Sequence, residues 1–158
     1  MYKRQGLRVA IGDCLANDNQ VINFVNFQYT AYLMNQDLAL CHAAGVVQNG
    51  QGLAMAGVSG AGKSTLALHA ISGGMDFASN DRLLVGPGAT GIEMTGVPKH
   101  PRINPGTALA NPDLRAVVPS ERARVLEALP REELWELEEK YDAQIDLLYE
   151  GPRITLHA

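Results

Sequence analysis

One glycine-rich segment constrains this chain more than any other feature. Residues 57–64 have the spacing G-x-x-x-x-G-K-S, and Thr65 follows directly. Residues 52–56 before the segment are small and apolar, which predicts a buried strand, and residues 63–72 after it predict a helix. A strand, a glycine loop and a helix in this order are typical of a phosphate-binding loop. Glycine lets consecutive backbone N–H groups point inward at phosphate oxygens.

The residue types in this segment also assign roles toward a bound nucleotide. We expect Lys63 to reach the β- and γ-phosphates of ATP, and the Ser64 hydroxyl to bind Mg²⁺. The start of the following helix adds a partial positive charge that favours anions. The predicted ATP-binding residues are Gly57, Val58, Ser59, Gly60, Ala61, Gly62, Lys63, Ser64 and Thr65.

Composition narrows the classes of protein that this chain can belong to. Its 158 residues predict one domain over 1–158, and 46% hydrophobic with 19% charged residues is typical of a globular protein. A net charge of −4 without a basic cluster argues against nucleic-acid binding. No apolar run approaches the roughly 18 residues that a membrane span needs. Cys14 and Cys41 lack the spacing of a disulfide framework or metal site, which favours a reducing cytoplasm.

Apolar periodicity predicts an α/β domain with a helical C-terminal segment. Asn49-Gly50 predicts a tight hairpin, and Gly73-Gly74 ends the helix after the loop. Four prolines and two glycines in 96–112 predict an ordered loop. The predicted strands are 6–12, 21–27, 38–48, 52–56, 75–79 and 82–85. From Ser120 onward the pattern is helical, with an apolar stripe of Leu134, Leu137, Tyr141, Ile145 and Leu148.

Two landmarks flank the glycine loop at fixed distances. His42 lies 15 residues before Gly57, and Asn80-Asp81 lies 17 and 18 residues after Lys63. This spacing resembles the catalytic domain of the HPr kinase/phosphorylase family, which has an active-site histidine and an Asp-Asp pair at these positions. The resemblance is closest to the HPr-kinase-related (kinase B-like) branch, whose substrate is not known.

Further segments extend this resemblance to about residues 6–150. Gly50 and Gly52 match the paired glycines of the family, and the stretches 96–107 and 133–142 look like the related branch. The resemblance implies a P-loop-containing, PEP carboxykinase-like fold. It also implies an ATP- and Mg²⁺-dependent phosphotransferase that acts on a hydroxyl, either a serine of a protein or a small serine-like molecule. Hexamers in the resembled family favour a homo-oligomer.

The same resemblance assigns the candidate catalytic residues. Asp81 is expected to bind Mg²⁺ together with Ser64, and His42 to polarise or deprotonate the acceptor hydroxyl. Without the resemblance, a strand-end aspartate caps a turn and a histidine in an apolar run belongs to the core. From the residues alone, Arg102 with Lys99 and His100 either forms a cationic clamp on the transferred phosphate or remains an exposed basic loop.

Asn80 keeps a second function open. It stands where the family has its first aspartate, and an amide cannot accept a proton, although it can orient a hydroxyl or a water. The Arg-Gly-x-Gly signature that the family links to phosphorolysis is absent from the sequence. A nucleotide-binding regulatory protein that has lost phosphoryl transfer is therefore the alternative, and a plain NTPase is a third. Residues 151–158 look unfinished, so we expect a chain truncated at its C-terminus.

Overall fold

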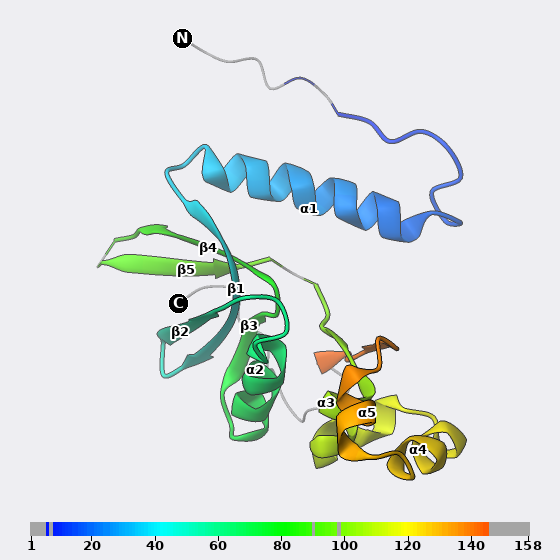
Figure 1. Ribbon diagram of the computed structural model, residues 1–158. Helices are drawn as coiled ribbons and strands as arrows, with labels where there is room; N and C mark the ends of the chain where they lie inside the picture. Colours follow the sequence, from blue (N-terminus) through cyan, green and yellow to red (C-terminus); the bar gives the residue numbers. More distant parts are fainter. Residues whose placement is uncertain (1–5, 7, 90, 98, 146–158) are drawn as a thin grey trace.

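The computed structural model describes residues 6, 8–89, 91–97 and 99–145. Their fold is mixed α/β, and every strand pair is antiparallel (Figure 1). The helices are α1 (Asp18–Met34), α2 (Lys63–Ser72), α3 (Pro105–Ala110), the 3₁₀ helix η1 (Pro112–Val117), α4 (Ser120–Glu127) and α5 (Arg131–Glu136). The strands are β1 (Ala39–Gln48), β2 (Gln51–Ala56), β3 (Asp76–Ser79), β4 (Arg82–Pro87), β5 (Ile92–Gly96), β6 (Arg102–Ile103) and β7 (Tyr141–Asp142).

The long strand β1 organises the main sheet, whose order is β2-β1-β4-β5. Its second half pairs with β2 through the predicted hairpin, where Asn49 and Gly50 have φ angles of 52° and 73°. It also pairs with β3 and then, through its first half, with β4. Gly45 lies opposite Ser79 in β3 and His42 opposite Arg82 in β4. The two short strands therefore follow one another along β1, with a break at residues 80–81.

The glycine-loop helix and the C-terminal helices share one hydrophobic core. Leu68 and Ile71 of α2 are buried against the sheet, and Figure 1 shows α3, α4 and α5 grouped beside α2. Leu126 and Ile145 are buried in the same cluster. None of the helices in the described part of the chain combines the length and apolar character that crossing a membrane requires.

The predicted strand at 21–27 is wrong, because these residues lie inside α1. Their β-branched and aromatic content is a weak prior that a longer helical pattern overrides. Val21, Phe24, Gln28 and Ala31 are half-buried at helical spacing, whereas Ile22 and Val25 face solvent. The predicted strand at 6–12 is also wrong: its described residues are exposed and have no partner strand.

The C-terminal stripe does not form one long helix. The helix α5 ends at Glu136, and the chain then extends so that β7 can pair with β6. A longer helix would add Glu139 three residues after Glu136, and like charges at this spacing destabilise a helix. The stripe residues still pack into the core, except Leu148, which lies outside the described residues.

Two smaller boundary predictions also change. Residues 96–112 were predicted as a loop, yet they contain β6 and α3. Asn104 caps α3 by accepting a hydrogen bond from the Thr107 N–H, and Pro105 stands at the first helical position. The strand predicted at 82–85 continues to Pro87, because Gly86 and Pro87 pair with β5. The strands predicted at 38–48, 52–56 and 75–79, and the helix at 63–72, are confirmed.

Candidate functional site

The glycine loop connects β2 to α2, as the sequence predicts. Gly60 and Gly62 have φ angles of 80° and 83°, in the left-handed region that favours glycine. The Ala61 N–H donates to the Val58 carbonyl at 3.2 Å, which closes a tight turn. The strand before the loop differs from its prediction, because β2 is an edge strand and is mostly exposed.

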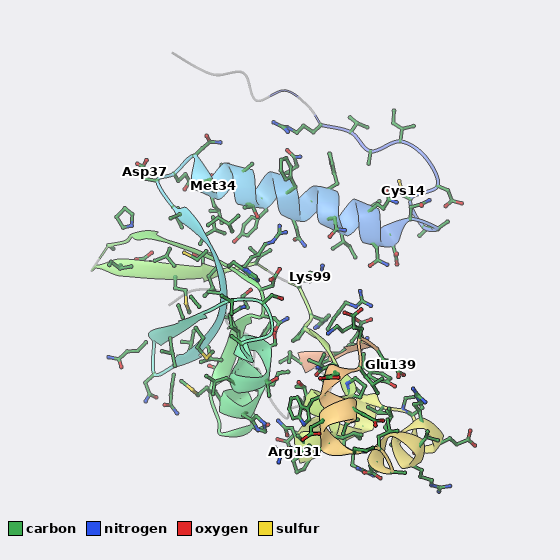
Figure 2. The ribbon with its side chains drawn as sticks, in the orientation of Figure 1. Cys14, Met34, Asp37, Lys99, Arg131 and Glu139 are labelled. Atoms are coloured by element: carbon green, nitrogen blue, oxygen red, sulfur yellow. The ribbon has the colours of Figure 1, made fainter. Side chains whose placement is uncertain are left out.

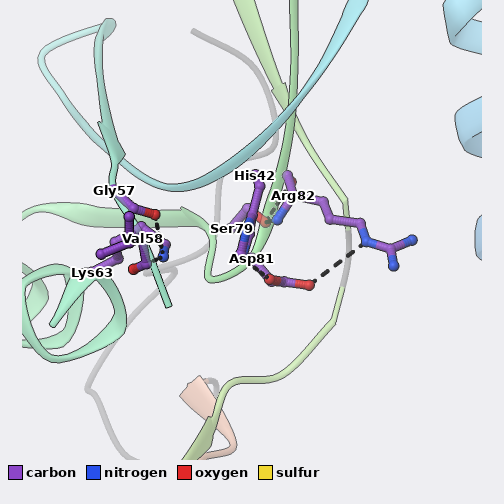
Figure 3. Close-up of polar contacts among 7 residues, drawn as sticks. All are labelled: His42, Gly57, Val58, Lys63, Ser79, Asp81 and Arg82. Carbon is purple, nitrogen blue, oxygen red and sulfur yellow. Dashed lines mark hydrogen bonds and ion pairs between the residues drawn. The ribbon is translucent and has the colours of Figure 1, made fainter. Parts of the chain in front are cut away.

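Lys63 folds back over the loop that precedes it (Figure 3). Its Nζ donates to the carbonyl oxygens of Gly57 at 2.9 Å and of Val58 at 3.1 Å. Among the described residues, no carboxylate pairs with this ammonium group. A lysine that is held by backbone carbonyls and not by a carboxylate is available to pair with an anionic ligand.

The break between β3 and β4 brings Asp81 to His42. The Nε2 atom of His42 lies 2.9 Å from Oδ1 of Asp81, and Nε of Arg82 lies 3.6 Å from Oδ2 (Figure 3). The backbone holds this arrangement, because the Ala43 N–H donates to the Asp81 carbonyl at 3.1 Å. Buried Ser79 donates its hydroxyl to the Arg82 carbonyl at 2.6 Å. The site thus arises from an interrupted antiparallel pair, not from the end of a parallel strand.

The loop and the strand break line one cavity of about 480 Å³. All four predicted catalytic residues line it: His42, Asn80, Asp81 and Arg102. Of the predicted ATP-binding residues, those that line it are Ser59, Gly60, Gly62, Lys63, Ser64 and Thr65. Gly57, Val58 and Ala61 do not line the cavity; the first two instead supply the carbonyls that hold Lys63. We call this space the loop cavity.

The loop cavity is also lined by four residues that the sequence did not indicate as site residues: Asn104, Thr107, Trp135 and Lys140. The hydroxyls of Thr65 and Thr107 are 2.8 Å apart, which joins the start of α2 to α3. Trp135 packs on Gly106 so closely that a Cβ there would lie 2.7 Å from its ring. The Asn-Pro pair at 104–105 is a helix-start signal that could have located this wall.

The charges around the loop cavity suit a phosphate ligand and its cation. Lys63, Arg102 and Lys140 contribute positive charge, against the carboxylate of Asp81. In the described part of the chain, no group of three or more His, Cys, Asp or Glu side chains could hold a metal ion by itself. Mg²⁺ is commonly held by one or two protein ligands together with substrate phosphates. The Ser64 hydroxyl and the Asp81 carboxylate fit that mode of binding.

A second cavity of about 360 Å³ adjoins the loop cavity. Its lining includes Lys99 and His100, and it shares Asn80, Asp81 and Arg102 with the loop cavity. The three basic residues, for which the sequence left both a clamp and an exposed loop open, are all exposed and lie together, with Arg102 between the two spaces. We call this second space the α1 cavity, because α1 forms one of its walls.

Comparisons of the chain with models of protein families, with curated proteins and with solved structures find no match. The resemblance to the HPr kinase family therefore remains a prediction from residue spacing. The geometry of the two cavities stands independently of that resemblance.

Proposed function

We propose that this chain is an ATP- and Mg²⁺-dependent phosphotransferase that acts on a hydroxyl, in the manner of the HPr-kinase-related branch. One observation carries the proposal: the glycine loop with Lys63 and the His42–Asp81 pair line the same cavity. Phosphoryl transfer requires mainly positioning and charge stabilisation, and this cavity offers both. We place the protein in the cytoplasm, where ATP is available and free cysteines such as Cys14 and Cys41 persist.

The loop cavity holds the nucleotide in this proposal. Backbone N–H groups of the glycine loop and the Lys63 ammonium bind the phosphates, and Arg102, which lines the same cavity, adds positive charge. Ser64 and Asp81 would hold Mg²⁺, which would neutralise part of the phosphate charge. Trp135 and Lys140 complete the side of the cavity that α5 and the following segment form.

The acceptor hydroxyl attacks the γ-phosphorus from the side of the His42–Asp81 pair. Its oxygen forms the new P–O bond while the bond from phosphorus to the β–γ bridging oxygen breaks, and ADP leaves. Asp81 accepts the Nε2–H of His42, so the Nδ1 atom remains to take the hydroxyl proton. The carboxylate then stabilises the imidazolium that forms. Asn80 cannot replace the histidine as the base, and its amide orients the hydroxyl.

The alternative is a nucleotide-binding regulatory protein, and Asn80 is the observation that favours it. A transfer assay separates the two functions. Wild-type protein is incubated with Mg²⁺, γ-labelled ATP and a cytosolic extract, and the labelled product is identified. If the chain is a phosphotransferase, the wild type and Arg124→Ala should transfer labelled phosphate, because the Arg124 side chain is exposed on α4 outside both cavities. Asp81→Asn should transfer none.

Nucleotide binding is measured on the same samples. If wild type binds ATP yet transfers no label to any of a broad set of hydroxyl acceptors, and Asn80→Asp also transfers none, the regulatory function is correct. If the wild type releases inorganic phosphate at the same rate with and without acceptors, the chain is an NTPase. If the wild type does not bind ATP, all three functions are wrong.

A further inference from the structure

We propose that the α1 cavity is the acceptor site, and that it takes small hydroxyl compounds that carry a carboxylate or another anionic group. This inference rests on the proposed function and adds the class of its substrate. It begins from a part of the molecule that the glycine loop does not explain, namely the space between α1 and the strand break.

The walls of the α1 cavity come from three separate parts of the chain. Asn23, Asn26 and Phe27 of α1 form one wall, and the break at 79–82 forms another. The segment from β5 to α3 closes the third side, and Figure 2 labels Lys99 on this segment, beneath α1. A space of about 360 Å³ lined by three amides and one aromatic ring suits a small polar molecule.

The two cavities meet at three residues, Asn80, Asp81 and Arg102. An acceptor whose hydroxyl extends past this junction into the loop cavity is next to Asp81 and reaches His42, which lines that cavity and contacts Asp81. A phosphate held by the glycine loop reaches the same junction from the other side. These three shared residues therefore lie between a nucleotide in the loop cavity and an acceptor in the α1 cavity, and transfer takes place at this junction.

Asn80 fits an acceptor that is both a hydroxyl donor and an anion. Its Oδ1 atom is buried and has no hydrogen-bond donor in the described structure. A buried acceptor atom without a donor is costly. Because Oδ1 is closed to solvent, the Asn80 amide must turn toward the cavity before a substrate hydroxyl can supply that hydrogen bond. An amide at this position carries no charge, whereas a second carboxylate beside Asp81 would repel an anionic substrate.

The charge of the α1 cavity points to the same class of substrate. Of its lining residues, Arg82, Lys99 and Arg102 are cationic and Asp81 is anionic, and His100 also faces this space. Arg82 is paired with Asp81, and Nε of Arg102 lies 3.4 Å from Oδ1 of Asp142. Lys99 has no carboxylate partner among the described residues and is exposed. It is therefore the anchor for the anionic group.

The test compares anions with neutral molecules of similar size. The full chain, loaded with Mg²⁺ and a non-hydrolysable ATP analogue, is titrated calorimetrically with glycolate and ethylene glycol, glycerate and glycerol, and gluconate and sorbitol. In at least one pair the anion is expected to bind tenfold or more tightly than its neutral counterpart. Lys99→Ala should reduce this preference to about threefold or less, because the side chain supplies the unpaired charge.

Two controls make the result specific to the α1 cavity. Arg124→Ala removes an exposed cation elsewhere and should leave the preference unchanged. Asn26→Ala should weaken acceptor binding, whereas Asn19→Ala, on the same helix but outside the cavity, should not. The affinity for the ATP analogue should be the same in all four variants.

Three outcomes are decisive. If no anion binds more tightly than its neutral counterpart, or if Lys99→Ala keeps the full preference, the inference is wrong even though the analogue binds. If the analogue does not bind to wild type, the proposed function fails instead. Transfer to a serine peptide but to none of the small anions would also overturn the inference, while it would support the phosphotransferase.

Discussion

The Nε2 atom of His42 lies 2.9 Å from Oδ1 of Asp81, although the two residues are far apart in the sequence. The antiparallel pairing of β1 with β3 and β4 creates this contact, since it sets His42 opposite Arg82 and the Ala43 N–H against the Asp81 carbonyl. Both side chains remain more than half exposed, at 63% and 56%. A pair held by backbone register but open to ligand is suited to proton transfer.

His42→Ala tests this pair. We expect transfer to fall by roughly 10²–10⁴-fold, which is the usual loss when a general base is removed. The affinity for ATP should change little, because Lys63 and the glycine loop are untouched. His69→Ala, on the exposed side of α2 and outside both cavities, is the matched control. Equal rates for the two variants would show that His42 takes no part in the reaction.

Lys63→Ala tests the glycine loop. Removal of a charge-assisted phosphate contact costs about 1.5–3 kcal/mol, so the affinity for Mg²⁺-ATP should fall at least tenfold. The fold should persist, since among the described residues the Lys63 ammonium donates to the carbonyls of Gly57 and Val58 and forms no ion pair. Calorimetric titration gives the affinity, and circular dichroism checks the fold. An unchanged affinity would reject the loop as the nucleotide site.

The local elements around the loop could be predicted from the sequence, whereas helix α1, which lines the second cavity, was predicted as a strand. Glycines at 60 and 62, the Asn49-Gly50 turn and the helix after Lys63 depend on short-range backbone preferences, and all are confirmed. Residues 21–27 carry strand-forming side chains, but only the longer helical spacing reveals α1. A short window cannot separate a period of two from a period of 3.6.

Among the residues that line the two cavities, those near the glycine loop could be located from the sequence, and those on α1 could not. His42, Asn80, Asp81 and Arg102 all line the loop cavity. The spacing of His42 and of Asn80-Asp81 from the loop corresponds to the strands between them, whereas for Arg102 the sequence left a phosphate clamp and an exposed basic loop equally open. Asn23, Asn26 and Phe27 were missed, since their role depends on how α1 lies across the sheet. Such tertiary placement leaves no local signal in a single sequence.

Leu68→Ala tests the core beneath the loop helix. Leu68 is fully buried, and truncation of a buried leucine typically costs about 2–5 kcal/mol of unfolding free energy. Leu66→Ala is the matched control, because Leu66 lies two residues away on the same helix and is 58% exposed. Urea denaturation should show a large loss for the first variant and a change within about 0.5 kcal/mol for the second. If both variants lose a similar amount of unfolding free energy, Leu68 does not face the core and the packing of α2 against the sheet is wrong.

The Arg122–Glu139–Tyr141 network gives a pH prediction. Hydrogen bonds from Arg122, and then from Tyr141, lower the pKa of Glu139 below its ordinary value of 4.5. Burial, and then the same carboxylate, raises the pKa of Tyr141. The stabilisation from Glu139 is therefore present above pH 4.5 and is lost as the pH falls through the lowered pKa. This network fixes the chain next to Lys140 in the loop cavity.

An NMR titration of the Glu139 carboxyl measures this effect directly. Its midpoint should lie below 4.5 in the wild type and return toward 4.5 in Arg122→Gln. Arg124→Gln, on the same helix, should leave the midpoint unchanged. A wild-type midpoint at or above 4.5 would contradict the network.

Trp135 provides a reporter for the loop cavity, because it is the single tryptophan of the chain and lines that cavity. Its ring packs on Gly106, where a Cβ would lie only 2.7 Å from Cδ2, so Gly106→Ala should displace the ring. Binding of Mg²⁺-ATP to wild type should change the tryptophan emission with a midpoint equal to the calorimetric affinity. In Gly106→Ala the emission of the free protein should already be altered and the response to ATP reduced.

Ala108→Gly, a substitution elsewhere on α3, controls for general loosening of that helix, at a cost of about 1 kcal/mol. If ATP binds calorimetrically but leaves the wild-type emission unchanged, the nucleotide does not occupy the side of the cavity that Trp135 forms.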